Sequence, residues 1–170
     1  SGAVAGLCPI TEASLGDGIF PTREFLDAGG RFGVGTDSNV LVGVADELRQ
    51  LEYGQRLKHH EPTVLSSGPG ISTGRALLDA ALAGGAQALA QPIVGLQAGA
   101  RADIVTLDVT HPSLAGRRRD VVLDGWIFAA NSGAIACVWA GGNKVVEGGR
   151  HRLRQKARDT FNAAVRRLVA

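Results

Sequence analysis

The chain has 170 residues, 45% of them apolar and 20% charged, a composition typical of a globular domain. Eighteen Lys and Arg residues against 16 Asp and Glu give a net charge of +2, which is too small to indicate nucleic acid as a partner. The apolar runs are too short to span a membrane and no secretory leader is recognised, so we expect a cytoplasmic protein.

The first strands and helices alternate along the chain. An apolar run over residues 3–7 predicts a buried strand, and a polar, Gly-rich loop is expected over residues 11–18. A short helix is then expected over residues 21–28, opened by Pro21 and ended by glycines. Residues 32–36 form a second predicted strand.

Two longer helices follow. Apolar residues at helical spacing predict a helix over residues 40–58, with Ser38 or Asn39 as its cap. Residues 66–70 are predicted to be a loop, and a helix over residues 72–83 is expected to stop at Gly84 and Gly85. This alternation is typical of a parallel α/β unit.

The second half has a different pattern. Residues 102–108, 135–140 and 144–147 are expected to be strands, the last two joined by a hairpin turn at residues 141–143. Residues 121–130 are predicted to be helical, as is the tail from Arg154. A shift in composition over residues 91–100 indicates a domain boundary.

Asp37 is the most suggestive candidate for chemistry. It ends the second predicted strand, within Gly35-Thr36-Asp37-Ser38-Asn39, and in parallel α/β folds catalytic groups gather at the carboxyl ends of strands. A carboxylate there can bind a cation or accept a proton. An Asp before a long helix is, however, also a common helix cap. On spacing alone, both interpretations stay open.

The cysteines and histidines give no local site. Cys8 and Cys137 lie far apart in apolar surroundings and are expected to be buried free thiols. His59 and His60 end the long helix on different faces and are expected to be solvated. The sequence also contains no Met, and it opens in a strand, so we expect the chain to be part of a longer protein.

Several motifs occur in the order found in amidohydrolase-superfamily deaminases. Residues 5–9 with 11–18 resemble the seventh strand of those enzymes and its loop, and residues 35–39 resemble the eighth strand. Residues 99–105, Gly-Ala-Arg-Ala-Asp-Ile-Val, resemble the strand that leads into the superfamily's small β domain. Residues 47–56 and 126–129 are most similar to the formimidoylglutamate deiminases.

This resemblance implies a fold. Residues 1–90 would be the C-terminal part of a TIM-like (β/α)8 barrel, comprising strands seven and eight with their helices. Residues 91–150 would belong to a small β-sandwich domain, and residues 151–170 would form a C-terminal helix.

The resemblance also implies a chemistry. A divalent metal, usually zinc, would activate water for hydrolytic deamination of N-formimidoyl-L-glutamate to N-formyl-L-glutamate and ammonia, a step of histidine degradation. Asp37 would be the metal ligand and the catalytic proton carrier. Glu12 and Asn39 lie on loops facing the expected site and are candidates to bind substrate, although helix capping or turn formation explains them equally well.

The family's histidine ligands have no counterparts in this chain. Catalytic zinc requires about three protein ligands, and two strands do not close a barrel. We therefore expect the missing N-terminal part or a partner chain to complete the site, a homodimer as the assembly, and no activity from these residues alone. Two alternatives stay open: a superfamily hydrolase acting on guanine, cytosine or a chlorotriazine, and a non-catalytic structural or binding module.

Overall fold

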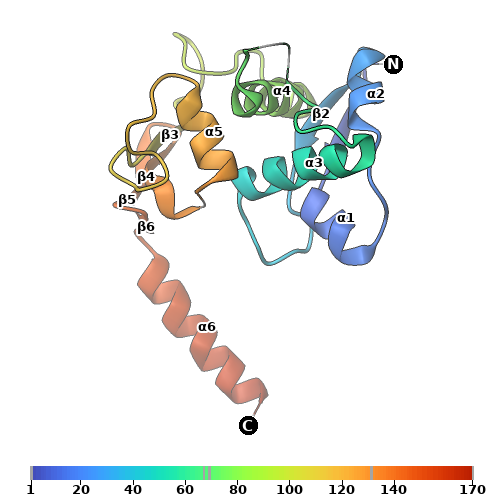
Figure 1. The fold of residues 1–170 in the computed structure, drawn as a ribbon. Helices are drawn as coiled ribbons and strands as arrows, with labels where there is room; N and C mark the ends of the chain where they lie inside the picture. Colours follow the sequence, from blue (N-terminus) through green and yellow to red (C-terminus); the bar gives the residue numbers. More distant parts are fainter. Residues whose placement is uncertain (1, 67, 69, 131, 170) are drawn as a thin grey trace.

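The computed structural model describes residues 2–66, 68, 70–130 and 132–169 (Figure 1). In chain order, its elements are β1 (Val4–Leu7), α1 (Pro9–Leu15), α2 (Thr22–Asp27), β2 (Arg31–Val34), α3 (Val44–His59), α4 (Thr73–Ala88), β3 (Ile104–Leu107), α5 (Val121–Phe128), the 3-10 helix η1 (Ser132–Ala134), β4 (Ile135–Ala140), β5 (Asn143–Glu147), β6 (Arg150–His151) and α6 (Arg154–Leu168). Among the described residues, no helix is both long and apolar enough to cross a membrane.

The first half is built on a parallel pair of strands. β1 pairs with β2 in the register Val4 to Arg31 and Leu7 to Val34, and α1 and α2 form the connection between them. Parallel pairing brings the carboxyl ends of both strands to the same edge. That edge therefore collects the residues that follow Leu7 and those that follow Val34.

The structure differs from the predicted elements in the segment after β1 and at the start of α3. The segment over residues 11–18 lies largely in α1, which begins at Pro9 and ends at Gly16, a glycine in the left-handed conformation that follows many helices. Helix α3 begins at Val44, with Gly43 as its cap, so neither Ser38 nor Asn39 caps it. The predicted loop at residues 66–70 includes residues 67 and 69, which lie outside the described part.

Helix α4 packs closely on β2. A Cβ atom added at Gly84 would lie 1.9 Å from the Phe32 carbonyl oxygen, and one added at Gly33 would lie 3.3 Å from the Gly85 backbone. The sequence predicted that the helix stops at Gly84 and Gly85. That prediction is wrong. Gly84 lets the helix approach the strand, and α4 continues to Ala88.

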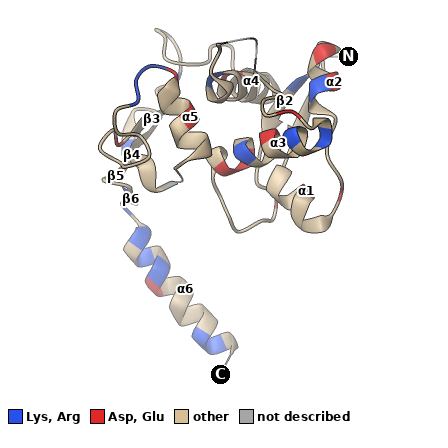
Figure 2. Cartoon of the chain, viewed as in Figure 1, with Lys and Arg blue, Asp and Glu red and all other residues tan. Residues whose placement is uncertain are grey.

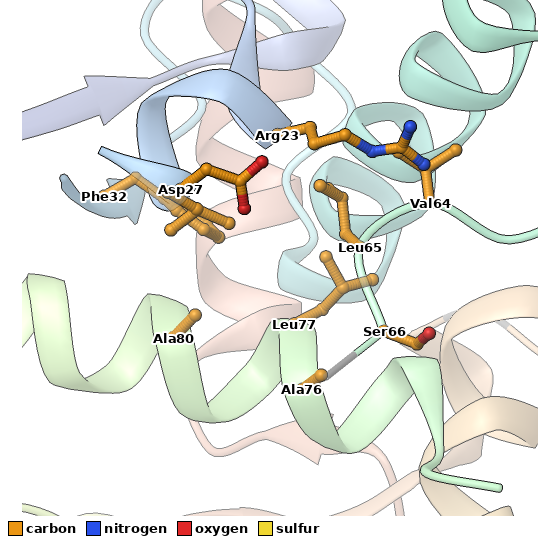
Figure 3. Close-up of a pocket in the computed structure, with 10 residues that line it drawn as sticks. Arg23, Asp27, Phe32, Val64, Leu65, Ser66, Ala76, Leu77 and Ala80 are labelled. Atoms are coloured by element: carbon orange, nitrogen blue, oxygen red, sulfur yellow. The ribbon is translucent and has the colours of Figure 1, made fainter. Parts of the chain in front are cut away.

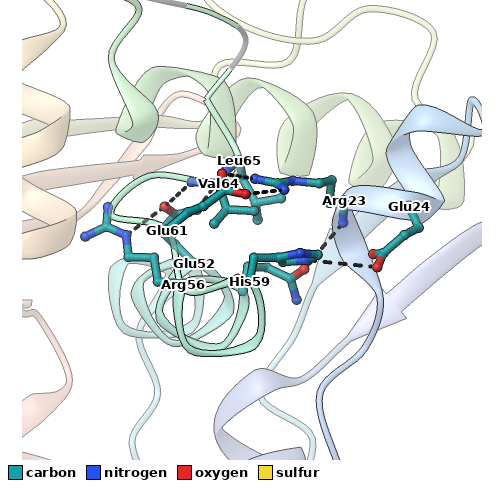
Figure 4. Close-up of polar contacts among 9 residues, drawn as sticks. Arg23, Glu24, Glu52, Arg56, His59, Glu61, Val64 and Leu65 are labelled. Carbon is teal, nitrogen blue, oxygen red and sulfur yellow. Dashed lines mark hydrogen bonds and ion pairs between the residues drawn. The ribbon is translucent and has the colours of Figure 1, made fainter.

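Helix α3 presents buried polar side chains to the loops around it. Glu47, Glu52 and Gln55 are each no more than 1% exposed. Glu52 accepts hydrogen bonds from the backbone N–H groups of Val64 and Leu65, both at 3.0 Å (Figure 4). The Gln55 amide donates to the Phe20 carbonyl oxygen at 2.7 Å. Glu52 and Gln55 thus hold two different loops against the helix.

Ion pairs join α2 to the end of α3, and Figure 4 shows the one between Arg23 and Glu61. Arg23 pairs with Glu61 at 2.6 Å, and Lys58 with Glu24 at 3.0 Å. The His59 Nε2 atom is buried without a hydrogen-bond partner and lies 3.9 Å from the Glu24 carboxylate. The expectation that His59 is solvated is therefore wrong, because α2 packs over it.

The second half contains an antiparallel sheet of order β3-β4-β5-β6. The predicted turn is confirmed, with β4 and β5 pairing through Ala140 and Asn143. Helix α5 joins this half to the first. The Asp124 carboxylate accepts the Gly74 N–H at 2.8 Å at the start of α4, and the Arg49 guanidinium donates to the Ile127 carbonyl at 3.1 Å.

Helix α6 extends away from the rest of the molecule (Figure 1), and none of its described residues is buried. Phe161 and Leu168 on its apolar stripe are 68% and 84% exposed. Basic residues lie near both ends of the helix (Figure 2). Elsewhere, buried apolar residues of both halves form one core cluster, which includes Leu7, Phe32, Leu48, Leu77, Leu114 and Ile127.

Candidate active-site edge of the parallel sheet

The carboxyl ends of β1 and β2 are tied together directly. The Thr11 hydroxyl, in the first turn of α1, donates to the Thr36 carbonyl oxygen at 2.8 Å. The Gly35 N–H donates to the Leu7 carbonyl oxygen at 2.9 Å, which extends the pairing beyond the strands. The residues after β1 and those after β2 therefore form one surface, as expected for a parallel sheet.

Asp37 lies in a tight turn at this edge. The turn is closed by the Asn39 N–H, which donates to the Thr36 carbonyl at 3.1 Å. Asp37 has a φ of +46°, in the left-handed region that non-glycine residues seldom adopt, and its side chain is exposed. Its carboxylate accepts no hydrogen bond within the described part of the chain. The Asp37 side chain is thus exposed at the strand end.

Glu12 folds back onto its own helix. Its Oε1 atom accepts the Cys8 N–H at 2.7 Å, and this N–H lies just before the first turn of α1. One carboxylate oxygen is therefore used to satisfy a backbone donor that the helix leaves unpaired. Glu12 nevertheless lies at the same edge as Asp37.

The Asn39 side chain is held by hydrogen bonds within the chain. Its Nδ2 group donates to the Thr36 carbonyl and to the Glu47 carboxylate, both at 2.9 Å. Its Oδ1 atom accepts the Leu41 N–H at 2.7 Å. Both amide hydrogens are thus used, and one oxygen lone pair remains for another donor.

Glu47 is a residue that sequence reasoning missed. Besides binding Asn39, it accepts the Ile10 N–H at 3.0 Å, so its two oxygens join helix α1, which follows β1, to the turn that follows β2. The available signal was a Glu beside the apolar positions Leu48 and Leu51 of an amphipathic helix. A carboxylate on the buried side of a helix must find donors, and the donors here are at the strand ends.

We refer to Cys8, Glu12, Asp37, Asn39 and Glu47 as the strand-end cluster. The pKa of the Cys8 thiol is raised, first by burial and then by the negative charges of Asp37, Glu12 and Glu47. The three carboxylates therefore act together on one thiol and create a negative field at this edge. Such a field attracts cations.

The strand-end cluster has some, but not all, of the ligands that a zinc ion requires. A carboxylate oxygen is a common zinc ligand, and Asp37 offers one that is exposed and unpaired within the described residues. However, no group of three or more His, Cys, Asp or Glu side chains in the described part of the chain could hold a metal ion. These residues could supply one ligand of a zinc site but not the whole site.

A cavity of about 300 Å³ lies away from this edge (Figure 3). It is lined mainly by apolar side chains, with Arg23 and Asp27 among its polar groups. Arg23 is paired with Glu61, and no residue of the strand-end cluster lines the cavity. The candidate chemistry is therefore at the sheet edge rather than in the cavity.

Comparison with known proteins decides the family. The amidohydrolase family model matches residues 1–145, which is most of the chain. The chain belongs to the amidohydrolase family. The crystal structure of an amidohydrolase from Brucella melitensis superposes with a TM-score of 0.90 and 56% sequence identity, covering 99% of this chain and 37% of that one.

Other family members are also similar. The formimidoylglutamate deiminase of Pseudomonas aeruginosa is 50% identical over 161 residues, covering 95% of this chain and 36% of the relative. A zinc complex of the atrazine chlorohydrolase TrzN from Arthrobacter aurescens has 26% identity and a TM-score of 0.73, covering 95% of this chain and 35% of that one. This amidohydrolase chain thus spans about a third of the length of the relatives that it matches.

Proposed function

We propose that this chain is part of a hydrolase that converts N-formimidoyl-L-glutamate to N-formyl-L-glutamate and ammonia. The observation that carries the proposal is the 50% identity, over 161 residues, to the formimidoylglutamate deiminase of P. aeruginosa. That similarity is far higher than the 33% identity to a 5-methylthioadenosine/S-adenosylhomocysteine deaminase of Natronomonas pharaonis, and the 26% to TrzN. The comparisons therefore do not favour the triazine, guanine or cytosine alternatives.

The proposed architecture follows the same similarity. Residues 1–90 are assigned to the C-terminal part of a TIM-like barrel, with β1 and β2 as its seventh and eighth strands. Residues 91–150 are assigned to a small β-sandwich domain, and residues 151–170 to a C-terminal helix. The parallel pairing of β1 with β2 and the antiparallel sheet β3-β4-β5-β6 support this division. A cytoplasmic homodimer is the assembly that we expect.

Asp37 is assigned the central role in the chemistry. A zinc ion bound at this edge would lower the pKa of a bound water and polarise the amidine. In the proposed hydrolysis, a water oxygen would add to the formimidoyl carbon, the bond from that carbon to the terminal nitrogen would break, and ammonia would leave. The Asp37 carboxylate would bind the metal, accept a proton from the water and return it to the departing nitrogen. Histidine ligands would come from residues outside this chain.

Glu12 and Asn39 are assigned to the substrate side of the site. The Glu12 Oε2 atom is free of the contact that holds Oε1, and a carboxylate there could accept an N–H of the substrate. Asn39 has only one oxygen lone pair left, so we assign it a weaker contact. Its intramolecular bonds support a role in shaping the turn as well.

The test is ammonia release from N-formimidoyl-L-glutamate by the complete enzyme that contains these residues, with and without zinc. Asp37→Asn keeps the size of the side chain but removes its charge and proton affinity. We expect kcat to fall by about 10²- to 10⁴-fold, the range for loss of a general acid–base group. Asp79→Asn, an exposed Asp paired with Arg75 on α4, is the matched control and should leave kcat unchanged. Full activity of Asp37→Asn would remove the role proposed for Asp37.

A further inference from the structure

Glu47 connects helix α1 and the turn after β2, the two segments that carry the proposed active-site residues. Its side chain is 1% exposed, and its two oxygens have different partners. Oε2 accepts the Ile10 N–H at 3.0 Å, in the helix that carries Glu12. Oε1 accepts the Asn39 amide at 2.9 Å, in the turn that carries Asp37. A single buried carboxylate on α3 therefore contacts both strand ends.

The turn that holds Asp37 depends on this contact. The Thr36 carbonyl accepts donors from Thr11 and from both the backbone and the side chain of Asn39. The same Asn39 Nδ2 group reaches Glu47, so Glu47 fixes the orientation of the amide that closes the turn. Asp37 has a left-handed backbone within this turn, and such a conformation persists only where its surroundings impose it.

We propose that Glu47 is a positioning residue, which holds Asp37 in the geometry needed to bind the metal while making no contact with substrate. This inference rests on the function proposed for Asp37. Residues that orient metal ligands through hydrogen bonds typically change metal affinity or activity by 10- to 100-fold when mutated. Glu47 would act one step farther out, through Asn39 and the turn.

Glu47→Gln tests the proposal with little change in shape. A glutamine has one accepting oxygen, and its nitrogen only donates. Two donors would therefore face each other, either at the Ile10 N–H or at the Asn39 amide. Rotating the Asn39 amide would only move the conflict, because its Oδ1 atom already accepts the Leu41 N–H.

Glu52→Gln is the matched control. Glu52 lies on the same helix, is 0% exposed, and also accepts two backbone N–H groups. Its partners are Val64, Leu65 and the Arg56 guanidinium, however, and none of them belongs to the strand-end cluster (Figure 4). Both substitutions place a donor against buried donors, so both should lower the melting temperature of the enzyme. Only the Glu47 substitution should affect the metal.

The experiment uses the complete enzyme and measures zinc affinity by chelator competition, kcat and KM with N-formimidoyl-L-glutamate, and hydrogen exchange of peptides covering residues 8–16 and 35–42. For Glu47→Gln we expect zinc affinity and kcat to fall about 10- to 100-fold, with KM less affected and faster exchange in both peptides. For Glu52→Gln, zinc affinity and kcat should stay within twofold of the wild type. Equal losses in the two variants, or an unchanged zinc affinity and kcat in Glu47→Gln, would overturn the proposal.

A second variant covers the case in which Glu47→Gln does not fold. Asn39→Ala removes the amide through which Glu47 acts and should lower zinc affinity in the same direction. A loss confined to KM would instead indicate that Asn39 only contacts substrate, and would count against the positioning role. If the wild-type enzyme releases no ammonia from this substrate, the proposed function fails, whereas the zinc-affinity and exchange comparisons still decide the role of Glu47.

Discussion

The Cys8 thiol reports on the charges gathered at the strand ends. Burial and the nearby carboxylates of Asp37, Glu12 and Glu47 all raise its pKa, because each disfavours the thiolate. The raised pKa of Cys8 also makes the free energy of unfolding depend on pH. The folded state holds the thiol proton more tightly than the unfolded chain, so this contribution to the free energy of unfolding is present below the unfolded pKa and is lost as the pH rises through the folded pKa.

Alkylation of Cys8 should therefore respond to Asp37. Only the thiolate reacts, so the rate constant for iodoacetamide at a fixed pH near 8 depends on the pKa of Cys8. In the metal-free enzyme, Asp37→Asn removes one negative charge, lowers that pKa and should speed the reaction, as followed by mass spectrometry of the Cys8 peptide. Asp79→Asn should not change the rate. An unchanged or slower rate in Asp37→Asn would show that this carboxylate does not face the thiol.

At the residue scale, the sequence identifies Asp37 as a candidate but does not reveal the contacts of Glu47 that hold its turn. The motif at residues 35–39 and its place at a strand end were enough to single out Asp37 as a candidate. The role of Glu47 depends on which donors meet it at long range, Ile10 from 37 positions away and Asn39 from eight. No local pattern contains that information, although a Glu on an apolar helix face indicates that some partner is required.

At the element scale, periodicity predicted the elements better than their ends. The strand at residues 135–140 and the hairpin after it are confirmed, because alternation and turn glycines are local signals. The prediction wrongly placed residues 40–42 in the helix, because their apolar side chains extend the apolar pattern of its sequence. In the structure α3 begins at Val44, and Val40 and Leu41 are exposed at 91% and 63%.

Gly84 and Gly85 were wrongly predicted to end a helix, and their backbone conformation explains the error. A glycine signals a helix end when its φ is positive, but neither residue has a positive φ. Gly84 is instead required by close packing, since a Cβ there would meet the Phe32 carbonyl. Only the neighbouring strand reveals that requirement.

This pair gives a prediction for stability. In the complete enzyme, Gly84→Ala should force α4 away from β2 and lower the free energy of unfolding by about 1–3 kcal/mol, the range for overpacked sites. Gly85→Ala is the matched control, because a Cβ there meets nothing within 4 Å. It should be neutral or add up to about 1 kcal/mol through helix propensity. Urea unfolding of both variants measures the difference, and equal effects would contradict the close packing.

At the scale of the whole molecule, one core joins the two halves, yet several apolar surfaces have no cover among the described residues. β1 and β2 form a sheet of two strands, whose outer edges carry unpaired backbone groups. Val40, Leu41, Val42 and Val44 form an exposed apolar run beside the strand-end cluster, and the apolar stripe of α6 is exposed along its length. Exposed apolar side chains that lie next to one another often mark contacts with other protein segments.

The 170-residue chain should therefore behave differently alone and within the complete enzyme. Expressed by itself, it should aggregate or bind a hydrophobic dye, bind zinc far more weakly than the complete enzyme because Asp37 is a single ligand, and release no ammonia from N-formimidoyl-L-glutamate. Light scattering after gel filtration and zinc titration calorimetry measure the first two properties. A stable, monodisperse, metal-free monomer would instead favour a self-contained binding module. The exposed strand edges argue against that outcome, because a sheet of two strands rarely persists without further strands or helices to cover it.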